Sequence, residues 1–423
     1  MERALLVGAP LKRTGARRVI DDHLRELSEL ADTAGANVVG TLTQQIDRPN
    51  PSTYLGKGKL EELRERVGEA EASLVLFDDE LSPTQAKNIE DAIGKRVMDR
   101  AELILDIFAT RARTSEAKMQ VELAQLEYML PRLTRMWTHL EKFRGGIGMR
   151  GPGETQLETD RRLISHRIKI LRERLHDLQR GRAVQRQSRA GEFKASLVGY
   201  TNAGKSSILR ALSGQEVFVE DRLFATLDPL TRDVDLGDHA HVLVTDTVGF
   251  IRKLPHHLVA SFRATLEETK EADLLLHVID ASSPTWEEQR VVVDQVLDEL
   301  GVIDRPKLLV FNKIDLLEHD ALLALQERIA ALVPSSVFVS AVGEEGLEPL
   351  RRALASALRV RRPLTEIRMS PSDGKLLAEI HRTGEVLEQR MEGDRLLVRA
   401  RVDEAMAGRL KRAGAELSNG KPH

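Results

Sequence analysis

Short apolar runs alternate with amphipathic stretches over the N-terminal part of the chain. The runs have the length of buried strands and cover residues 4–9, 37–46, 72–79 and 95–99. Between them, apolar residues recur every three or four positions, which predicts helices over residues 19–35, 61–70 and 82–94. Ser82 followed by Pro83 is a typical helix start. Strands separated by helices predict a small α/β domain with a mostly parallel sheet over residues 1–108.

The pattern then becomes continuously helical in two long stretches, residues 109–143 and 154–187. Leucine, isoleucine and methionine are spaced three or four apart in both stretches, as on one face of a helix. A glycine-rich segment, "RGGIGMRGPGETQLE", separates them. We expect an antiparallel helical hairpin over residues 109–190 with a Gly-rich tip, and we expect Pro131 to kink its first helix.

A second alternation of strands and helices follows, over residues 191–360. Its predicted strands are apolar runs, each followed by a helical stretch, at residues 193–198, 241–246, 272–280, 306–315 and 335–341. This order predicts a second, mostly parallel sheet with helices on both faces. The remaining residues, 361–423, have the order βαββα, which predicts a small C-terminal α+β domain.

Composition narrows the class of protein. The absence of cysteine excludes disulfides and thiolate metal sites. Aromatic residues make up only 4% of the chain, which argues against a broad base-stacking platform. The N-terminus lacks the pattern of a signal peptide, and no apolar run approaches the roughly 20 residues that span a bilayer. We expect a soluble, cytoplasmic monomer without a membrane-spanning segment, able to associate peripherally with a membrane.

The first motif that indicates a binding site is "GYTNAGKS", Gly199–Ser206. It fits G-x-x-x-x-G-K-[ST] and lies between a predicted strand and a predicted helix. Glycines let backbone N–H groups converge on phosphate oxygens, and the helix N-terminus adds a partial positive charge. Lys205 can reach the β and γ phosphates, and the Ser206 hydroxyl can ligate Mg²⁺. This segment predicts a nucleotide-phosphate site.

Three further groups follow at the ends of later predicted strands. Asp246 ends "HVLVTD" and can hold the Mg²⁺ shell, and Gly249 can place its N–H on the γ-phosphate. "NKID" ends another strand, where Asp315 can accept two hydrogen bonds that guanine offers and adenine does not. Ser340 and Ala341 follow the next strand and suit the guanine carbonyl. Together these groups predict binding of GTP and GDP.

Beyond these motifs, the chain resembles the HflX family of bacterial ribosome-associated GTPases. The resemblance is carried by "YLGKGKLEEL", "GMRGPGETQLE", "FATLDPLTR" and "DTVGFIRKLP", and it is weaker in the tail. It implies a P-loop GTPase domain and assigns residues 224–228 to a switch segment in which Thr226 is a second protein ligand of Mg²⁺ beside Ser206. The residues alone do not choose among Thr226, Thr231 and Thr201 for this role. It also implies docking on the 50S subunit and splitting or rescue of stalled ribosomes under stress such as heat shock.

With this resemblance, Lys205, Thr226 and Gly249 are the predicted catalytic residues. The predicted nucleotide contacts are Gly199, Tyr200, Thr201, Asn202, Ala203, Gly204, Lys205, Ser206, Phe224, Ala225, Thr226, Leu227, Asp228, Asp246, Thr247, Val248, Gly249, Asn312, Lys313, Ile314, Asp315, Ser340, Ala341 and Val342. Two alternatives stay open: a GTPase accessory to ribosome assembly or RNA modification, and a non-enzymatic adaptor timed by GTP.

The residue after D-x-x-G is Phe250 rather than the glutamine that orients water in many GTPases. Phenylalanine cannot hydrogen-bond water, so we expect slow hydrolysis unless a partner, by resemblance the ribosome, stimulates it. Asn202 suggests a K⁺ site that assists hydrolysis, although asparagine is also simply a good turn residue.

Residues 131–190 hold 15 Lys and Arg against 6 Asp and Glu, in a chain of net charge −3. A solvated helix pair with internal charge pairs explains this excess, and so does contact with RNA phosphates. A second phosphate cradle at the tip is less favoured, because the loop follows a helix and lacks G-K-[ST]. The residues predicted to contact rRNA of the 50S subunit are Arg144, Gly146, Arg150, Gly151, Gly153, Lys57 and Lys59. For Lys57 and Lys59, a loop that only precedes the next helix is an equally good interpretation.

Overall fold

The structure is a computed structural model that describes residues 2–12, 17–133, 152–187, 192–215, 220, 222–237, 240–254, 268–333, 335–343 and 345–419. The chain forms two compact units. The first comprises Met1–Arg182, Glu220–Asp228 and Ile251–Ala264, and the second comprises Ala183–Val219, Pro229–Phe250 and Thr265–His423. Among the described residues, no helix is both long enough and apolar enough to cross a membrane.

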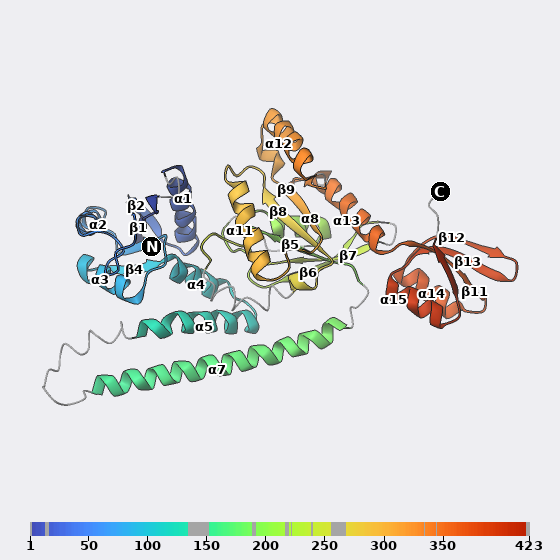
Figure 1. Cartoon of the computed structure of the whole chain (residues 1–423), viewed down its shortest axis with the longest axis horizontal. Coiled ribbons are helices and arrows are strands. Elements are labelled where there is room, and N and C mark those ends of the chain that lie inside the picture. The colour runs from blue at the N-terminus through green and yellow to red at the C-terminus, as the bar shows by residue number, and fades with distance from the viewer. Residues whose placement is uncertain are drawn as a thin grey trace. The chain divides into compact units, whose positions relative to one another are not determined.

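The first unit begins with a four-stranded parallel sheet of order β2-β1-β3-β4 (Figure 1). Its strands are β1 (Arg3–Gly8), β2 (Asn37–Thr43), β3 (Leu74–Phe77) and β4 (Arg96–Asp99). Its helices are α1 (Arg17–Thr33), α2 (Lys57–Glu69) and α3 (Pro83–Ile93). Every strand and helix predicted here is present. Ser82 caps α3 through a capping box with Gln85, and Pro83 takes the first helical position.

The hairpin that follows differs from the prediction in its first half. Instead of one helix from residue 109, α4 (Arg100–Arg111) ends at Ala112, and α5 (Ser115–Met129) starts anew with Thr114 as its N-cap. The expected continuous helix was wrong because Ala112 and Thr114 have extended backbones and the Thr114 hydroxyl accepts from the Ala117 N–H. The 3₁₀ turn η2 (Leu130–Arg132) lies at Pro131, and residues 134–143 lie outside the described part.

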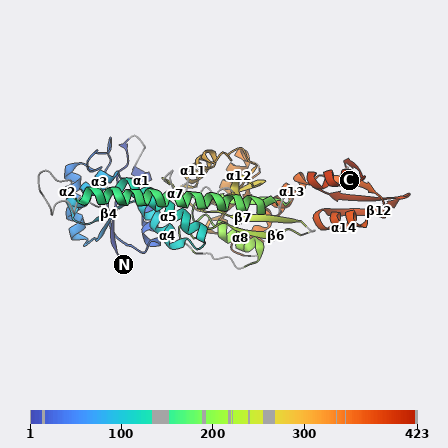
Figure 2. The same cartoon turned by 90° about the horizontal axis from the view of Figure 1, so that it is seen from below.

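The second half of the hairpin is the long helix α7 (Pro152–Gln187). Leu123 of α5 packs with Ile168, Leu171 and Leu175 of α7 in one buried cluster. Two ion pairs, Arg167–Glu122 and Arg172–Glu127, both at 2.7 Å, flank this seam. Figures 1 and 2 both show α7 lying along α5. The central part of the predicted apolar stripe therefore faces the partner helix, whereas Leu163 and Leu178 are exposed.

The second unit contains a six-stranded sheet of order β10-β9-β8-β5-β7-β6, parallel except for β6. Its strands are β5 (Lys194–Gly199), β6 (Leu230–Asp235), β7 (His241–Asp246), β8 (Leu274–Asp280), β9 (Lys307–Asn312) and β10 (Val337–Phe338). Its described helices include α8 (Lys205–Ser213), α11 (Trp286–Glu299), α12 (His319–Leu332) and α13 (Glu348–Arg361), with 3₁₀ turns η3 (Ile314–Leu316) and η4 (Glu345–Leu347). The antiparallel strand β6 was not among the predicted strands.

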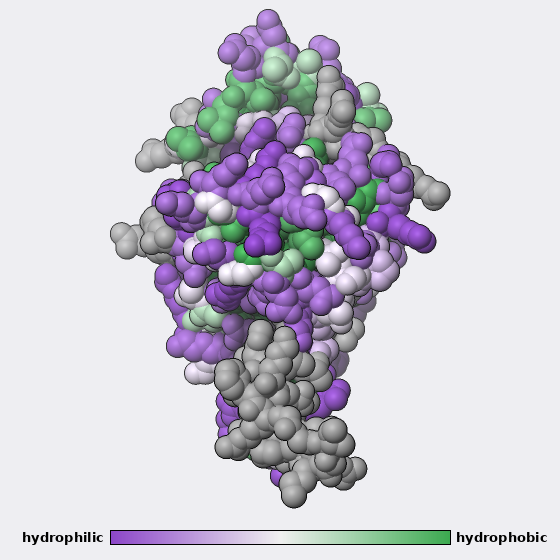
Figure 3. Space-filling model, turned by 90° about the vertical axis from the view of Figure 1, so that its left-hand side faces the viewer, coloured by the Kyte–Doolittle hydropathy of each residue, from purple (hydrophilic) through white to green (hydrophobic). Residues whose placement is uncertain are grey.

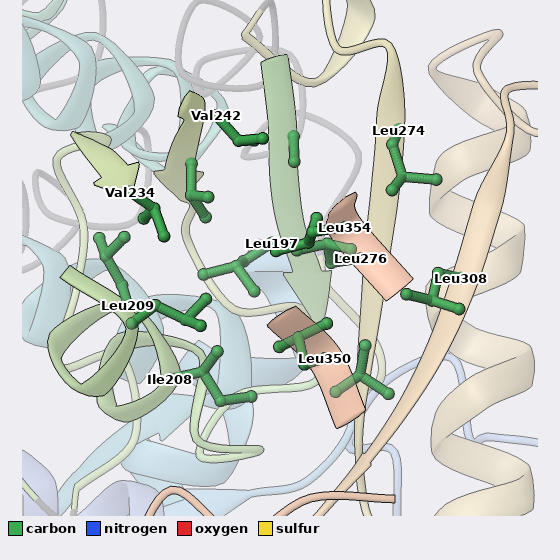
Figure 4. Close-up of a cluster of buried hydrophobic side chains, with 14 of the residues drawn as sticks. Leu197, Ile208, Leu209, Val234, Val242, Leu274, Leu276, Leu308, Leu350 and Leu354 are labelled. Atoms are coloured by element: carbon green, nitrogen blue, oxygen red, sulfur yellow. The ribbon is translucent and has the colours of Figure 1, made fainter. Parts of the chain in front are cut away.

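One buried apolar cluster joins this sheet to the helices on one of its faces. Figure 4 shows Leu350 and Leu354 of α13 in the same cluster as Leu197 of β5 and Leu276 of β8. All four side chains are fully buried. Truncating such a leucine to alanine typically costs about 2–5 kcal/mol. This core fixes the strand ends at which the predicted nucleotide motifs lie.

The second unit also holds the C-terminal domain, whose order is β11 (Leu364–Met369), α14 (Gly374–Thr383), β12 (Glu385–Glu392), β13 (Arg395–Arg401), α15 (Glu404–Arg412) and β14 (Glu416–Asn419). The predicted βαββα order therefore lacks the last strand. The sheet has the order β12-β13-β11-β14 and is antiparallel, which is the ferredoxin-like βαββαβ arrangement. "ELSN" has too short an apolar pattern to predict a strand, and its pairing with β11 forms one.

Candidate functional site: a phosphate loop and a base-recognition loop

The second unit places the loop 199–206 between β5 and α8, as the sequence predicts. Gly199 has no room for a side chain, because an added Cβ would lie 2.3 Å from the Val278 carbonyl oxygen. Gly204 has a φ of 91°, and an added Cβ would lie 2.2 Å from Nδ2 of Asn312. Both glycines are thus required for the path of this loop. Asn202, with a φ of 59°, takes the left-handed conformation that asparagine tolerates better than most residues.

Lys205 is buried at the start of α8, and its ammonium donates to the carbonyl oxygens of Gly199 (3.3 Å) and Tyr200 (2.9 Å). Burial lowers the pKa of Lys205 to about 8, while the nearby Asp246 carboxylate opposes the shift. The loop's own carbonyls therefore hold the ammonium in place. A phosphate brought into this loop would meet a cation already fixed beside it.

The Ser206 hydroxyl donates to Oδ2 of Asp246 at 2.6 Å. This contact follows from the sheet, because Asp246 at the end of β7 pairs with Leu197 of β5. A hydroxyl and a carboxylate oxygen are the hard ligands that suit Mg²⁺. Among the residues that the structure describes, no group of three or more His, Asp or Glu could hold a metal alone. The donor set therefore fits a Mg²⁺ ion completed by phosphate oxygens and water.

The D-x-x-G segment is tied to the phosphate loop through its backbone. The Phe250 N–H donates to the Gly199 carbonyl at 3.0 Å, and the Thr201 N–H donates to the Phe250 carbonyl at 2.6 Å. An added Cβ at Gly249 would lie 2.6 Å from Cα of Thr201 and 3.0 Å from Nζ of Lys205. Glycine is therefore required at 249. The Phe250 side chain is buried, as are Thr247 and Val248.

Asn312, at the end of β9, joins the phosphate loop to the loop after β10. Its buried amide donates to the Ala203 carbonyl at 3.0 Å, and its Oδ1 accepts from the Ala341 N–H at 3.2 Å. Such a buried, fully engaged amide is costly to lose because its partners would be left unsatisfied. Asn312 thus has a bridging role that the sequence did not reveal.

Asp315 lies in η3 and accepts a hydrogen bond from the Ser340 hydroxyl at 2.5 Å. The Ser340 hydroxyl also accepts from the Val342 N–H at 3.2 Å, and the Val342 side chain is exposed. Lys313, with a φ of 63°, forms an ion pair with Asp280 at 2.7 Å, and Ile314 opens η3. The two loops predicted to recognise guanine are thus adjacent.

Sequence reasoning missed two residues that shape this end of the site. Asp280, at the end of β8, pairs with Lys313. Gly346 accepts from the Ser340 N–H at 3.2 Å, and an added Cβ there would lie 2.2 Å from the Ser340 carbonyl oxygen. The position of Asp280 at the end of a predicted strand could have indicated its place at the site, whereas nothing in the sequence marks Gly346.

The remaining predicted residues lie in the first unit. Within residues 224–228, Phe224 and Leu227 are buried and Thr226 is half-buried, while Phe224 has a φ of 55°, unusual for a bulky residue. Asp228 accepts hydrogen bonds from Arg113 and Thr114. Of the predicted rRNA contacts, Lys57 is exposed at the start of α2 and Lys59 pairs with Glu62 at 2.8 Å. Gly153 lies in the first turn of α7, and Arg144, Gly146, Arg150 and Gly151 lie outside the described residues.

Three family models match this chain in succession. They are described as "GTP-binding GTPase N-terminal" (residues 21–109), "GTP-binding GTPase Middle Region" (residues 111–189) and "50S ribosome-binding GTPase" (residues 194–313). GTPase HflX of Caldanaerobacter subterraneus is 47% identical over 397 residues, which is 92% of this chain and 90% of that protein. This chain belongs to the HflX family of GTPases.

Other members of the HflX family match to a similar extent. GTPase HflX of Escherichia coli is 45% identical over 375 residues, 88% of each chain. Among solved structures, a GTP-binding protein from Sulfolobus solfataricus in complex with GDP is 26% identical, with a TM-score of 0.45, and the match covers 85% of this chain and 100% of that one. The chain is thus a P-loop GTPase, an enzyme that hydrolyses GTP.

Proposed function

We propose that this protein is a Mg²⁺-dependent GTPase that docks in its GTP form on the 50S ribosomal subunit and there splits or rescues stalled ribosomes under stress such as heat shock. The observation that carries the proposal is the match of residues 194–313 to a 50S ribosome-binding GTPase, joined to a strongly basic hairpin. GTPase HflX relatives of nearly the same length support it. Action in the cytoplasm, as a monomer, belongs to the same proposal.

The proposed nucleotide site uses the geometry of the second unit. Backbone N–H groups of the loop 199–206 and the Lys205 ammonium would bind the β and γ phosphates, while Gly249 would donate its N–H to the γ-phosphate. Asp315 and Ser340, hydrogen-bonded to each other, would recognise guanine. Ser206 would hold Mg²⁺, with Asp246 acting on its water shell, and the family resemblance alone adds Thr226 as a second protein ligand. A bound Mg²⁺ supplies neutralisation of the charge that develops on the transferring phosphoryl group.

Hydrolysis by this site alone should be slow. The buried Phe250 side chain offers no hydrogen bond to an attacking water, and its backbone is occupied by the phosphate loop. A partner that orders residues 224–228 and the water would then raise the rate. A turn alone explains the left-handed backbone conformation of Asn202. The proposal of a K⁺ ion there therefore rests only on the residue type.

One exposed side of α7 is the surface proposed to contact RNA. Arg162 and Lys169, seven residues apart and hence on one side of the helix, are both exposed. Arg167 and Arg172, by contrast, pair with glutamates of α5. The face drawn in Figure 3 is mostly hydrophilic over its described surface, with apolar side chains near the top of the view and in smaller patches at its centre and right. Basic side chains of this kind suit RNA phosphates.

The experiment is cosedimentation of the full chain with 50S and 70S particles, in GTPγS and in GDP, over a salt series. The variant Arg162→Glu/Lys169→Glu should lower the affinity for 50S and reduce the slope of log affinity against log salt by about 2. The matched control is Arg352→Glu/Arg359→Glu, the same charge change at the same spacing on exposed positions of α13.

Equal binding in GTPγS and GDP, or binding that is insensitive to salt, would refute the proposed GTP-dependent RNA docking and favour the protein adaptor. Scoring the 70S sample for subunit dissociation separates the proposed splitting from an assembly or modification role. Binding to 50S with intact 70S particles would count against splitting.

A further inference from the structure

The segment that carries Thr226 is anchored to the junction between α4 and α5. The ring of Phe224 meets the ring of Phe108 of α4 edge to face, with centroids 4.7 Å apart, and both rings are fully buried. Arg111, in the last turn of α4, forms an ion pair with Glu220. These contacts lie within the first unit. They explain how Phe224 is held at its positive φ.

Asp228 joins this segment to the start of α5 through three hydrogen bonds. Its Oδ2 accepts from the backbone N–H groups of Arg113 and Thr114, both at 3.3 Å, and its Oδ1 accepts from the Thr114 hydroxyl. Thr114 is itself the N-cap of α5, where its hydroxyl oxygen accepts from the Ala117 N–H at 3.1 Å. The Asp228 carboxylate therefore binds the end of a helix that favours negative charge.

We infer that Asp228 is a positioning residue for GTP hydrolysis rather than a nucleotide ligand, and that it ties the segment 224–228 to the first helix of the hairpin. The inference rests on the proposed role of Thr226 at the nucleotide, two residues earlier in the chain. A change in Thr226 between the GTP and GDP states then changes the hold of Asp228 on α5. Because such coupling is reciprocal, a partner that binds and orders α5 also changes the relative affinity of the protein for GTP and GDP.

Thr114 and Asp228 take part in one shared interaction, so variants at the two positions should not have independent effects. Removing the Asp228 carboxylate should release the segment, whereas removing the Thr114 hydroxyl leaves the backbone N–H donors of Arg113 and Thr114 and should release it only in part. Once the carboxylate is gone, removing the hydroxyl as well should cost no further activity. The variants are Thr114→Val, which loses the hydroxyl, and Asp228→Ala, which loses the carboxylate but leaves the Thr114 cap on Ala117 in place. Thr114→Ser keeps the hydroxyl and should behave as the wild type. The control is Asp233→Ala, an exposed aspartate of β6 that pairs with His241.

Two measurements on the full chain test the inference. In hydrogen exchange, the first-turn amides of α5 should exchange at rates that differ at least threefold between the GDP and GTPγS forms of the wild type. In Asp228→Ala they should exchange about fivefold faster than in the wild type, with the difference between nucleotide states lost, whereas Thr114→Val should keep part of that difference. In turnover, Asp228→Ala and the double variant should show the same fall in kcat, about fivefold, and Thr114→Val a smaller fall, with GDP affinity within twofold of the wild type in all three.

Other results would overturn the inference. A tenfold loss of GDP affinity in Asp228→Ala, with α5 exchange unchanged, would make Asp228 a nucleotide ligand. Additive losses of kcat in the double variant, or equal exchange of α5 in both nucleotide states of the wild type, would show that the contact carries no coupling. Failure of the wild type to bind GTP at all would instead refute the proposed nucleotide site, so the two failures are distinguishable.

Discussion

We expect the buried His277 to make the GTPase domain less stable as the pH falls, and its replacement with leucine to remove this contribution. His277 lies in β8 and is 1% exposed, and neither ring nitrogen has a hydrogen-bond partner among the described residues. The carboxylate of Asp294 is 3.7 Å from Nδ1. Burial lowers the pKa of His277 from 6.5 to about 4, with Lys307 and Arg290 adding to the shift and Asp294 opposing it.

The direction of the pH effect on stability follows from whether the folded or the unfolded chain binds the proton more tightly. Because the folded pKa lies below the unfolded value, the unfolded chain takes up a proton first as the pH falls. The stabilisation is complete above 6.5 and is lost between 6.5 and about 4. The full loss is about 3 kcal/mol, and the part lost between about pH 7 and pH 5 is about 2 kcal/mol.

The assay is urea unfolding followed through the fluorescence of Trp286, which packs against Phe311 in the same domain. The chain has two tryptophans, so a Trp137→Phe background makes the signal specific. Between about pH 7 and pH 5, the free energy of unfolding of the wild type should fall about 2 kcal/mol more than that of His277→Leu.

The exposed His241 provides the control, because His241→Leu should follow the wild type. If the wild type and His277→Leu lose stability in parallel as the pH falls, the reasoning from the buried imidazole is wrong.

Three other predictions concern the nucleotide site. Gly204→Ala should weaken GDP binding at least tenfold, because its φ of 91° and the nearby Asn312 amide leave no room for a methyl group, and equilibrium titration with a fluorescent GDP checks this. Asp315→Asn should weaken GTP binding about a hundredfold, since a carboxylate that accepts from guanine is lost, and unchanged affinity for GTP would contradict the assignment. If Asn202 helps to bind K⁺, turnover in KCl should exceed turnover in NaCl at equal ionic strength, and equal rates would remove the idea.

The sequence by itself determined the local chemistry. The pattern G-x-x-x-x-G-K-[ST] between an apolar strand and a helix placed Lys205 and Ser206 where they lie, and Ser82 and Pro83 marked the start of α3. The alternation of strands and helices predicted the parallel sheet of the first unit and the parallel strands of the second, but not the antiparallel β6. These features are predictable because they depend on backbone conformation and burial over a few neighbouring residues.

The tertiary structure decided what depends on residues far apart in the chain. The break at Ala112 has a local mark in Thr114, a typical N-cap residue, but the Asp228 carboxylate that binds Thr114 comes from a distant segment. "ELSN" becomes the strand β14 because β11 offers it an edge. Asn312 joins two loops, and one of its hydrogen-bond partners, Ala203, lies more than a hundred residues before it in the chain. Such contacts arise from packing of the finished fold, and no local pattern in the sequence records them.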